Sequence, residues 1–83
     1  MEKHGITFEE ATTVFMDEMA VIFDDPEHSE DEDRSIIIGF SSAARMLIVC
    51  HCLRGEGDII RIISARKATK TEANQYTEIN QGW

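Results

Sequence analysis

The sequence MLIVCHCL at residues 46–53, followed by RGEGD at 54–58 and IIRIISA at 59–65, decides the fold. The two outer stretches are rich in aliphatic and β-branched side chains, and the glycines and charges between them are typical of a hairpin loop. A third stretch of the same kind, at residues 35–40, is followed by the polar and small residues 41–44. These segments predict an antiparallel meander.

A helix and a further strand are predicted before the meander. Thr7 and Glu10 have the spacing of a capping box, in which the first and fourth residues satisfy backbone groups at a helix start. Apolar residues then recur at helical spacing, which predicts a helix over residues 8–17. The short apolar segment 19–23 predicts a strand.

A closing helix is predicted after the meander, because Thr69 and Glu72 repeat the capping-box spacing. Its inner stripe is expected to hold Ala73, Tyr76 and Ile79. The predicted fold class is α+β: a helix, a four-stranded antiparallel sheet and a C-terminal helix. The 83 residues contain no internal repeat or low-complexity linker, so we expect one domain over residues 1–83.

Charge is distributed unevenly along the chain. Residues 1–33 carry twelve acidic side chains and one lysine, a formal charge of −11, whereas residues 34–83 carry seven Arg or Lys against four acids, a charge of +3. The acidic residues could simply form solvated faces. The basic half, and above all the end of the 59–65 segment with Arg66 and Lys67, offers fixed cations to a phosphate-bearing partner.

Several classes of protein are disfavoured. No segment is long enough to cross a bilayer and residues 1–5 lack the pattern of a secretory signal, so we expect a cytoplasmic protein without a membrane partner. Cys50 and Cys52 are expected to be reduced thiols. Strand alternation places His51 on the opposite face from both thiols, so we expect no metal site and no cofactor.

The hairpin register makes a prediction about two polar residues. A five-residue loop at 54–58 places His51 directly opposite Arg61, with both side chains on one face of the sheet. Two alternatives stay open: Arg61 could pair with an acidic side chain, and His51 could be a hydrogen-bonded sheet histidine without a functional role. A slip of one residue would break the pairing.

Three segments resemble the BrnT toxins: KHGITFEEA at residues 3–11, VIFDDP at 21–26 and IRIISARKAT at 60–69. The resemblance implies a RelE-like α+β fold and a type II toxin that acts as a ribonuclease and arrests growth. It also implies a BrnA-type antitoxin that neutralises the toxin. The complex would repress its own operon, so contact with DNA would be indirect, through the antitoxin.

If the chain has that activity, its residues suggest roles. RNA cleavage without metal needs activation of the 2′-hydroxyl, stabilisation of the charged phosphorane and protonation of the leaving oxygen. Arg61 and Arg66 suit bidentate phosphate contact, although an ideal strand places them on opposite faces, so Arg66 must turn at the strand end or serve the fold or a partner. His51 or His4 could carry protons. Further candidates, for positioning substrate, are Lys3 and Lys67.

One departure from the family pattern concerns the N-terminus. In the family pattern, BrnT chains begin earlier, with an additional strand and helix, so either the start codon is mis-assigned or the toxin is shortened, with or without loss of activity. This leaves an alternative function: a shortened, non-catalytic module that binds the antitoxin and modulates operon repression. In either case we expect the acidic residues 24–33 to meet basic residues of the antitoxin.

Overall fold

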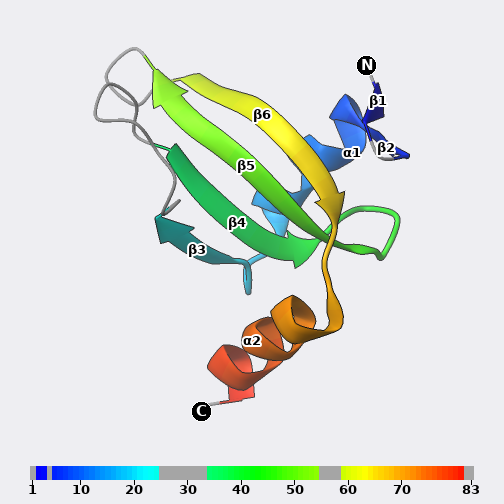
Figure 1. The fold of residues 1–83 in the computed structure, drawn as a ribbon, viewed down its shortest axis with the longest axis vertical. Coiled ribbons are helices and arrows are strands. Elements are labelled where there is room, and N and C mark those ends of the chain that lie inside the picture. The colour runs from blue at the N-terminus through cyan, green and yellow to red at the C-terminus, as the bar shows by residue number, and fades with distance from the viewer. Residues whose placement is uncertain (1, 4, 25–33, 55–58, 82–83) are drawn as a thin grey trace.

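The computed structural model describes residues 2–3, 5–24, 34–54 and 59–81 and has an α+β fold, as predicted (Figure 1). The elements in chain order are β1 (Glu2–Lys3), β2 (Ile6–Thr7), α1 (Phe8–Thr13), the 3-10 helix η1 (Val14–Met16), β3 (Val21–Asp24), β4 (Arg34–Phe40), β5 (Met46–Arg54), β6 (Ile59–Lys67) and α2 (Lys70–Gln81). The arrangement is compatible with the RelE-like fold. No helix among the described residues is long and apolar enough to cross a membrane.

The main sheet is the predicted meander, with strand order β3-β4-β5-β6 and antiparallel pairing throughout. The first strand begins at Val21 rather than at residue 19. The reason is a turn centred on Asp17, whose side chain accepts the Met19 N–H at 2.9 Å and whose carbonyl accepts the Ala20 N–H at 3.0 Å. Such side-chain-to-backbone bonds compete with strand pairing.

The predicted hairpin register is wrong. Arg54 pairs with Ile59, so β5 extends one residue further at the loop end than expected, and His51 lies opposite Ile62. Between Cys50 and His51 the register shifts, because Cys50 pairs with Ser64 and Ile63 is left without a partner. This is a β-bulge: one extra residue in β6 that reverses the alternation of every later side chain relative to β5.

The N-terminal helix is shorter than predicted, since α1 ends at Thr13 and continues as η1. The Thr7 hydroxyl accepts the Glu10 N–H at 3.0 Å, as the capping box predicts. The Glu10 carboxylate, however, binds Arg45 and accepts the Ser41 hydroxyl at 2.6 Å. Glu10 therefore ties the helix to the loop between β4 and β5.

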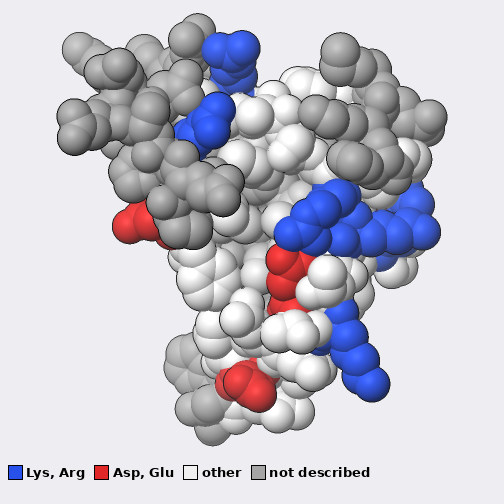
Figure 2. Space-filling view, viewed as in Figure 1, with Lys and Arg blue, Asp and Glu red and all other residues white. Residues whose placement is uncertain are grey.

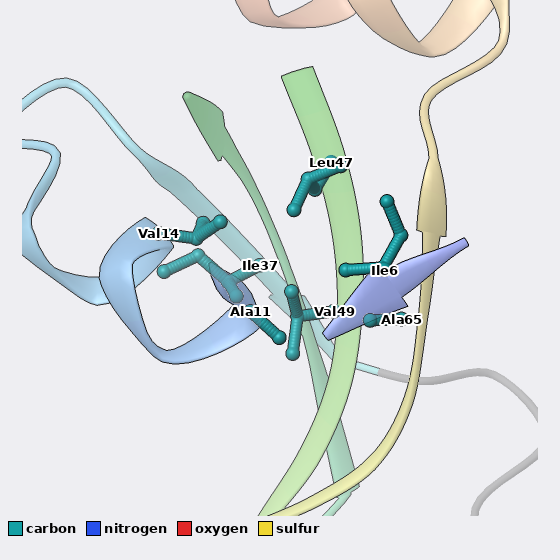
Figure 3. Packing of buried hydrophobic residues seen from close by; sticks show 7 residues of the cluster. All are labelled: Ile6, Ala11, Val14, Ile37, Leu47, Val49 and Ala65. Carbon is teal, nitrogen blue, oxygen red and sulfur yellow. The ribbon is translucent and has the colours of Figure 1, made fainter. Parts of the chain in front are cut away.

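The main core lies between the sheet and the N-terminal elements (Figure 3). Its buried residues come from β2, α1, η1 and three strands: Ile6, Ala11, Val14, Ile37, Leu47, Val49 and Ala65. Gly39 permits the close approach of η1, because a Cβ there would lie 3.0 Å from the Asp17 carboxylate and 3.1 Å from Val14. The face of the sheet that carries this core is called the α1 face.

The opposite face of the sheet is partly covered by α2, which lies below the sheet in Figure 1. Tyr76 packs on Ile38 and Ile48 in a second, smaller core, and its hydroxyl donates to Asp17 at 2.9 Å. Of the predicted stripe, Tyr76 is buried and Ala73 half-buried. Ile79 is 49 % exposed, so its predicted inner position is wrong.

Candidate functional site

The bulge at Ile63 determines where the cations of β6 lie. Arg61 is opposite Cys52, and Arg66 is opposite Ile48. Cys52 and Ile48 are four residues apart on β5, whose pairing with β4 is uninterrupted, so they share one face. Arg61 and Arg66 therefore start from the same face of the sheet, the one opposite α1. The expectation that they lie on opposite faces is wrong, because it assumed an ideal strand.

Arg61 is exposed at the end of this face near the β5–β6 hairpin. Among the residues that the structure describes, none forms a hydrogen bond or ion pair with its guanidinium. Arg34 occupies the same cross-strand row, because it pairs with Cys52 from the other side. Two arginine side chains thus flank Cys52 in this row.

Arg66 lies at the other end of the face and is bound by a carboxylate from α2. Its Nη1 and Nη2 each donate to one oxygen of Glu72 at 2.7 Å, and Nη1 also donates to the Lys67 carbonyl at 3.2 Å. The bonds from Arg66 are the main cause that lowers the pKa of Glu72 to about 2. Reciprocally, the Glu72 carboxylate raises the pKa of Arg66. The pair is charged at every physiological pH.

Positive charge gathers at two places on the face opposite α1. Figure 2, viewed as Figure 1, shows Lys and Arg side chains near the hairpin end of the sheet and again around the end of β6 and the start of α2, with neutral side chains between them. Acidic atoms lie against the second group, in agreement with the Arg66–Glu72 pair. We call this surface the arginine face.

His51 is not on the arginine face. Its side chain is only 4 % exposed, lies on the α1 face and meets the Phe15 ring edge-on at 4.9 Å. Nδ1 is 3.4 Å from the Val49 carbonyl, and since a carbonyl can only accept, Nδ1 is the donor in this contact. Burial lowers the pKa of His51, only partly opposed by that contact, so the imidazole is neutral at pH 7. The predicted His51–Arg61 pairing is wrong.

The remaining predicted residues are placed as follows. Lys67 is exposed on the α1 face, opposite Leu47, and its charge contributes to lowering the pKa of Glu10, for which the bond from Arg45 is the main cause. The Lys3 backbone pairs with Ile6, and β1 lies beside β6. The structure does not describe the side chain of Lys3. His4 lies outside the described residues.

The cysteines follow the predicted alternation. Cys52 is buried on the arginine face, Cys50 is half-buried on the same face, and His51 points the other way. Within the described parts of the chain, the two thiols form no disulfide and no group of three His, Cys, Asp or Glu side chains is placed to hold a metal ion.

Comparison with family models matches residues 1–72 to the BrnT ribonuclease toxins of type II toxin–antitoxin systems. The chain belongs to the BrnT family. A comparison with curated protein sequences gave no match. The BrnT match includes all of β1 to β6 and the first three residues of α2, so both partners of the Arg66–Glu72 pair lie inside it.

Two features of this BrnT chain were missed from sequence. Glu72 was recognised only as a helix cap. A carboxylate six residues after Arg66, at the start of the next helix, is also well placed to bind the arginine at the strand end. The bulge gave no signal in the sequence and shows only in the structure, where the inward-facing residues Ile62 and Ala65 are three apart, whereas an ideal strand separates same-face residues by two or four.

Proposed function

We propose that this BrnT chain is an endoribonuclease toxin that cleaves RNA without metal, uses the arginine face to bind the RNA backbone, and is neutralised by a BrnA-type antitoxin. The observation that carries the proposal is the gathering of Arg61 and Arg66 on one face by the Ile63 bulge, in a chain of the BrnT family. Two guanidinium groups on one exposed surface favour a polyanionic strand as ligand.

The proposed chemistry is attack of the 2′-hydroxyl on the adjacent phosphorus, with departure of the 5′-oxygen. Negative charge builds up on the non-bridging oxygens, so cations fixed beforehand lower the barrier. Arg61 is the proposed catalytic cation, because its planar fork is exposed and uncommitted among the described residues. Arg66 is proposed to hold a second phosphate of the same strand.

Proton transfer is proposed to fall to His4 or His51. The burial of His51 in the core of the α1 face counts against direct contact between its imidazole and RNA on the arginine face. His4 is therefore the histidine to test first, by His4→Ala. Lys3 and Lys67, at or beside the β6 edge, are proposed to position flanking nucleotides.

The test is cleavage of RNA by the purified chain in the presence of excess EDTA. Arg61→Ala should lower the rate about 10²-fold or more, the typical cost of removing one preorganised donor from a developing oxyanion. Lys70→Ala is the matched control for the loss of one positive charge: Lys70 is an exposed cation at the start of α2, at the other end of the arginine face, and is not proposed to contact the reacting phosphate, so this variant should lose far less activity. Equal rates for wild type and Arg61→Ala would reject the proposed site, and loss of cleavage in EDTA would reject metal independence.

The antitoxin proposal rests on family and on charge. Residues 24–33 include seven acidic side chains, of which Asp24 is exposed at the end of β3. We propose that this segment meets basic residues of a BrnA-type antitoxin and that the complex represses its operon. Charge reversal across the segment should weaken complex formation at low salt. Unchanged affinity would contradict the proposed contact.

A non-catalytic module that binds the antitoxin and modulates repression is the second candidate. The observations that favour it are the engagement of Arg66 by Glu72 and the burial of His51, which leave Arg61 as the most accessible of the predicted catalytic residues that the structure describes. This candidate predicts antitoxin binding with no RNA cleavage by the wild-type chain. The cleavage assay above, run beside an antitoxin-binding assay, separates the two.

A further inference from the structure

We propose that Glu72 is an internal competitor for RNA: its carboxylate occupies the two terminal nitrogens of Arg66, a site that a backbone phosphate would take, and RNA must displace it to bind there. This inference rests on the proposed RNA-binding function of the arginine face. It assigns Glu72 a role in regulating affinity, beyond its role in capping α2.

The geometry of the pair is that of a phosphate contact. Both terminal nitrogens of Arg66 donate to separate carboxylate oxygens at 2.7 Å, the parallel two-point arrangement in which arginine also recognises phosphate. Nη1 carries two hydrogens, and its second one is directed at the Lys67 carbonyl at 3.2 Å. A phosphate can therefore reach this edge of the guanidinium only by replacing Glu72.

Replacement does not require α2 to unfold. The Thr69 hydroxyl accepts the Glu72 N–H at 3.2 Å, and the Thr69 carbonyl accepts the Ala73 N–H at 2.8 Å, so the helix start is held by bonds that do not involve the Glu72 carboxylate. The side chains of Arg66 and Glu72 are 45 % and 25 % exposed, so solvent and ligands can reach the pair. Exposed ion pairs are weak enough to be exchanged for another anion.

The competitor makes the two ends of the arginine face unequal. Arg61 has no carboxylate bound among the described residues, whereas Arg66 does. The two arginines are separated by four residues of β5, on the order of 13 Å at 3.3 Å per residue. A single phosphate cannot span that distance. We therefore infer that the site favours strands of several nucleotides, which bind Arg61 and then compete with Glu72 at Arg66.

The experiment measures binding of a short fluorescein-labelled 2′-O-methyl RNA, which lacks the attacking hydroxyl and cannot be cleaved. Glu72→Gln removes the charge but keeps an acceptor for the capping box, in which glutamine is also favoured. Glu78→Gln makes the same charge change on an exposed position of the same helix and is the matched control. A double variant, Glu72→Gln with Arg66→Ala, tests whether any gain depends on Arg66.

Glu72→Gln should tighten binding roughly 2- to 5-fold, the range expected from exposed ion pairs. The slope of log affinity against log salt should steepen by about 0.7, the value of one additional phosphate contact on a single strand. Glu78→Gln should leave that slope unchanged, and the double variant should lose the gain.

Two results would overturn the inference. If Glu72→Gln binds RNA as wild type does, or more weakly, Glu72 does not compete with RNA, and its role is at most to position Arg66. The proposed function survives this result if Arg61→Ala still weakens RNA binding. If none of the forms binds RNA, the competitor and the proposed function both fall. If Glu78→Gln tightens RNA binding as much as Glu72→Gln does, the gain in affinity comes from the change in net charge, and the proposed competition by Glu72 is also rejected.

Discussion

Asp17→Asn should destabilise the protein severely, because Asp17 joins three parts of the fold. Its Oδ1 accepts the Met19 N–H, and its Oδ2 accepts both the Phe40 N–H and the Tyr76 hydroxyl, each at 2.9 Å. These donors come from the turn before β3, the end of β4 and the middle of α2. Asparagine has nearly the same shape but offers only one accepting oxygen.

The magnitude follows from counting bonds. In either orientation of the amide, its NH₂ group faces at least one backbone N–H, so one bond is lost and a donor faces a donor. The remaining bonds change from charge-assisted to neutral. At about 1.5–3 kcal/mol for a bond to a charged group and about 1 kcal/mol for a neutral one, the net loss is about 2–3 kcal/mol for this half-buried site.

The pH dependence has a definite sign. Burial by itself raises the pKa of Asp17, but the bonds from Phe40, Met19 and Tyr76 together outweigh it and leave the pKa lowered. A lowered pKa in the folded state means that the stabilisation is present above the unfolded-state pKa and is lost as the pH falls through the folded value. The difference between wild type and Asp17→Asn should therefore shrink in acid.

Urea unfolding followed by circular dichroism measures the effect. With an m-value of about 1 kcal/mol/M for a chain this small, a loss of about 2 kcal/mol lowers the midpoint by roughly 2 M. Glu18→Gln, an exposed neighbour with the same charge change, should stay within about 0.5 kcal/mol of wild type. Tyr76→Phe should lower the free energy of unfolding by about 1 kcal/mol. The same substitution should cost less than that in the Asp17→Asn background, because the two side chains share one hydrogen bond. Equal midpoints for Asp17→Asn and Glu18→Gln would refute the reasoning.

Two further predictions concern stability. Ala44 has a φ of 59°, in the left-handed region that disfavours a Cβ, so Ala44→Gly should raise the free energy of unfolding by about 0.5–1 kcal/mol; a lower urea midpoint would contradict this. The pKa values of Glu10 and Glu72 are lowered from 4.5 to about 2 by their bonds to Arg45 and Arg66, so the melting temperature should fall as the pH drops from about 4.5 to 2. The melting temperature of Glu10→Gln should fall less steeply over that interval than that of wild type. An equal fall would contradict the lowered pKa of Glu10.

Most of the secondary structure could be predicted from sequence because the local signals are strong. The meander followed from long β-branched runs separated by turn residues, and both helix starts followed from Thr-to-Glu spacing at residues 7–10 and 69–72. The errors lie where tertiary contacts decide. Asp17 delays β3 to Val21, and Ile79 is exposed because α2 meets the sheet mainly through Tyr76.

The candidate site was less predictable, because it depends on a single extra residue. Ile59, Ile60, Ile62 and Ile63 are alike in size and polarity, so the pattern of β6 does not reveal which isoleucine leaves the ladder. A register can be predicted reliably where apolar and polar residues alternate, and it is weakly specified where they do not. The pairing of His51 with Arg61 failed separately, at the loop end, where Ile59 pairs with Arg54 and not with Leu53.

The pairing of β5 with β6 has two opposite consequences for chemistry. The bulge at Ile63 brings Arg61 and Arg66 to one face, which strengthens the case for phosphate binding, whereas the register set at the loop end leaves His51 opposite Ile62 on the face that α1 covers. Charge stabilisation and proton transfer are therefore separated by the sheet itself, unless His4 supplies the proton carrier. Preorganised cations commonly contribute the largest share of the rate acceleration in such catalysis. A positioned acid or base adds a further factor of about 10²–10⁴ to the rate. An arginine face without an imidazole would therefore give a slow ribonuclease and not an inert protein.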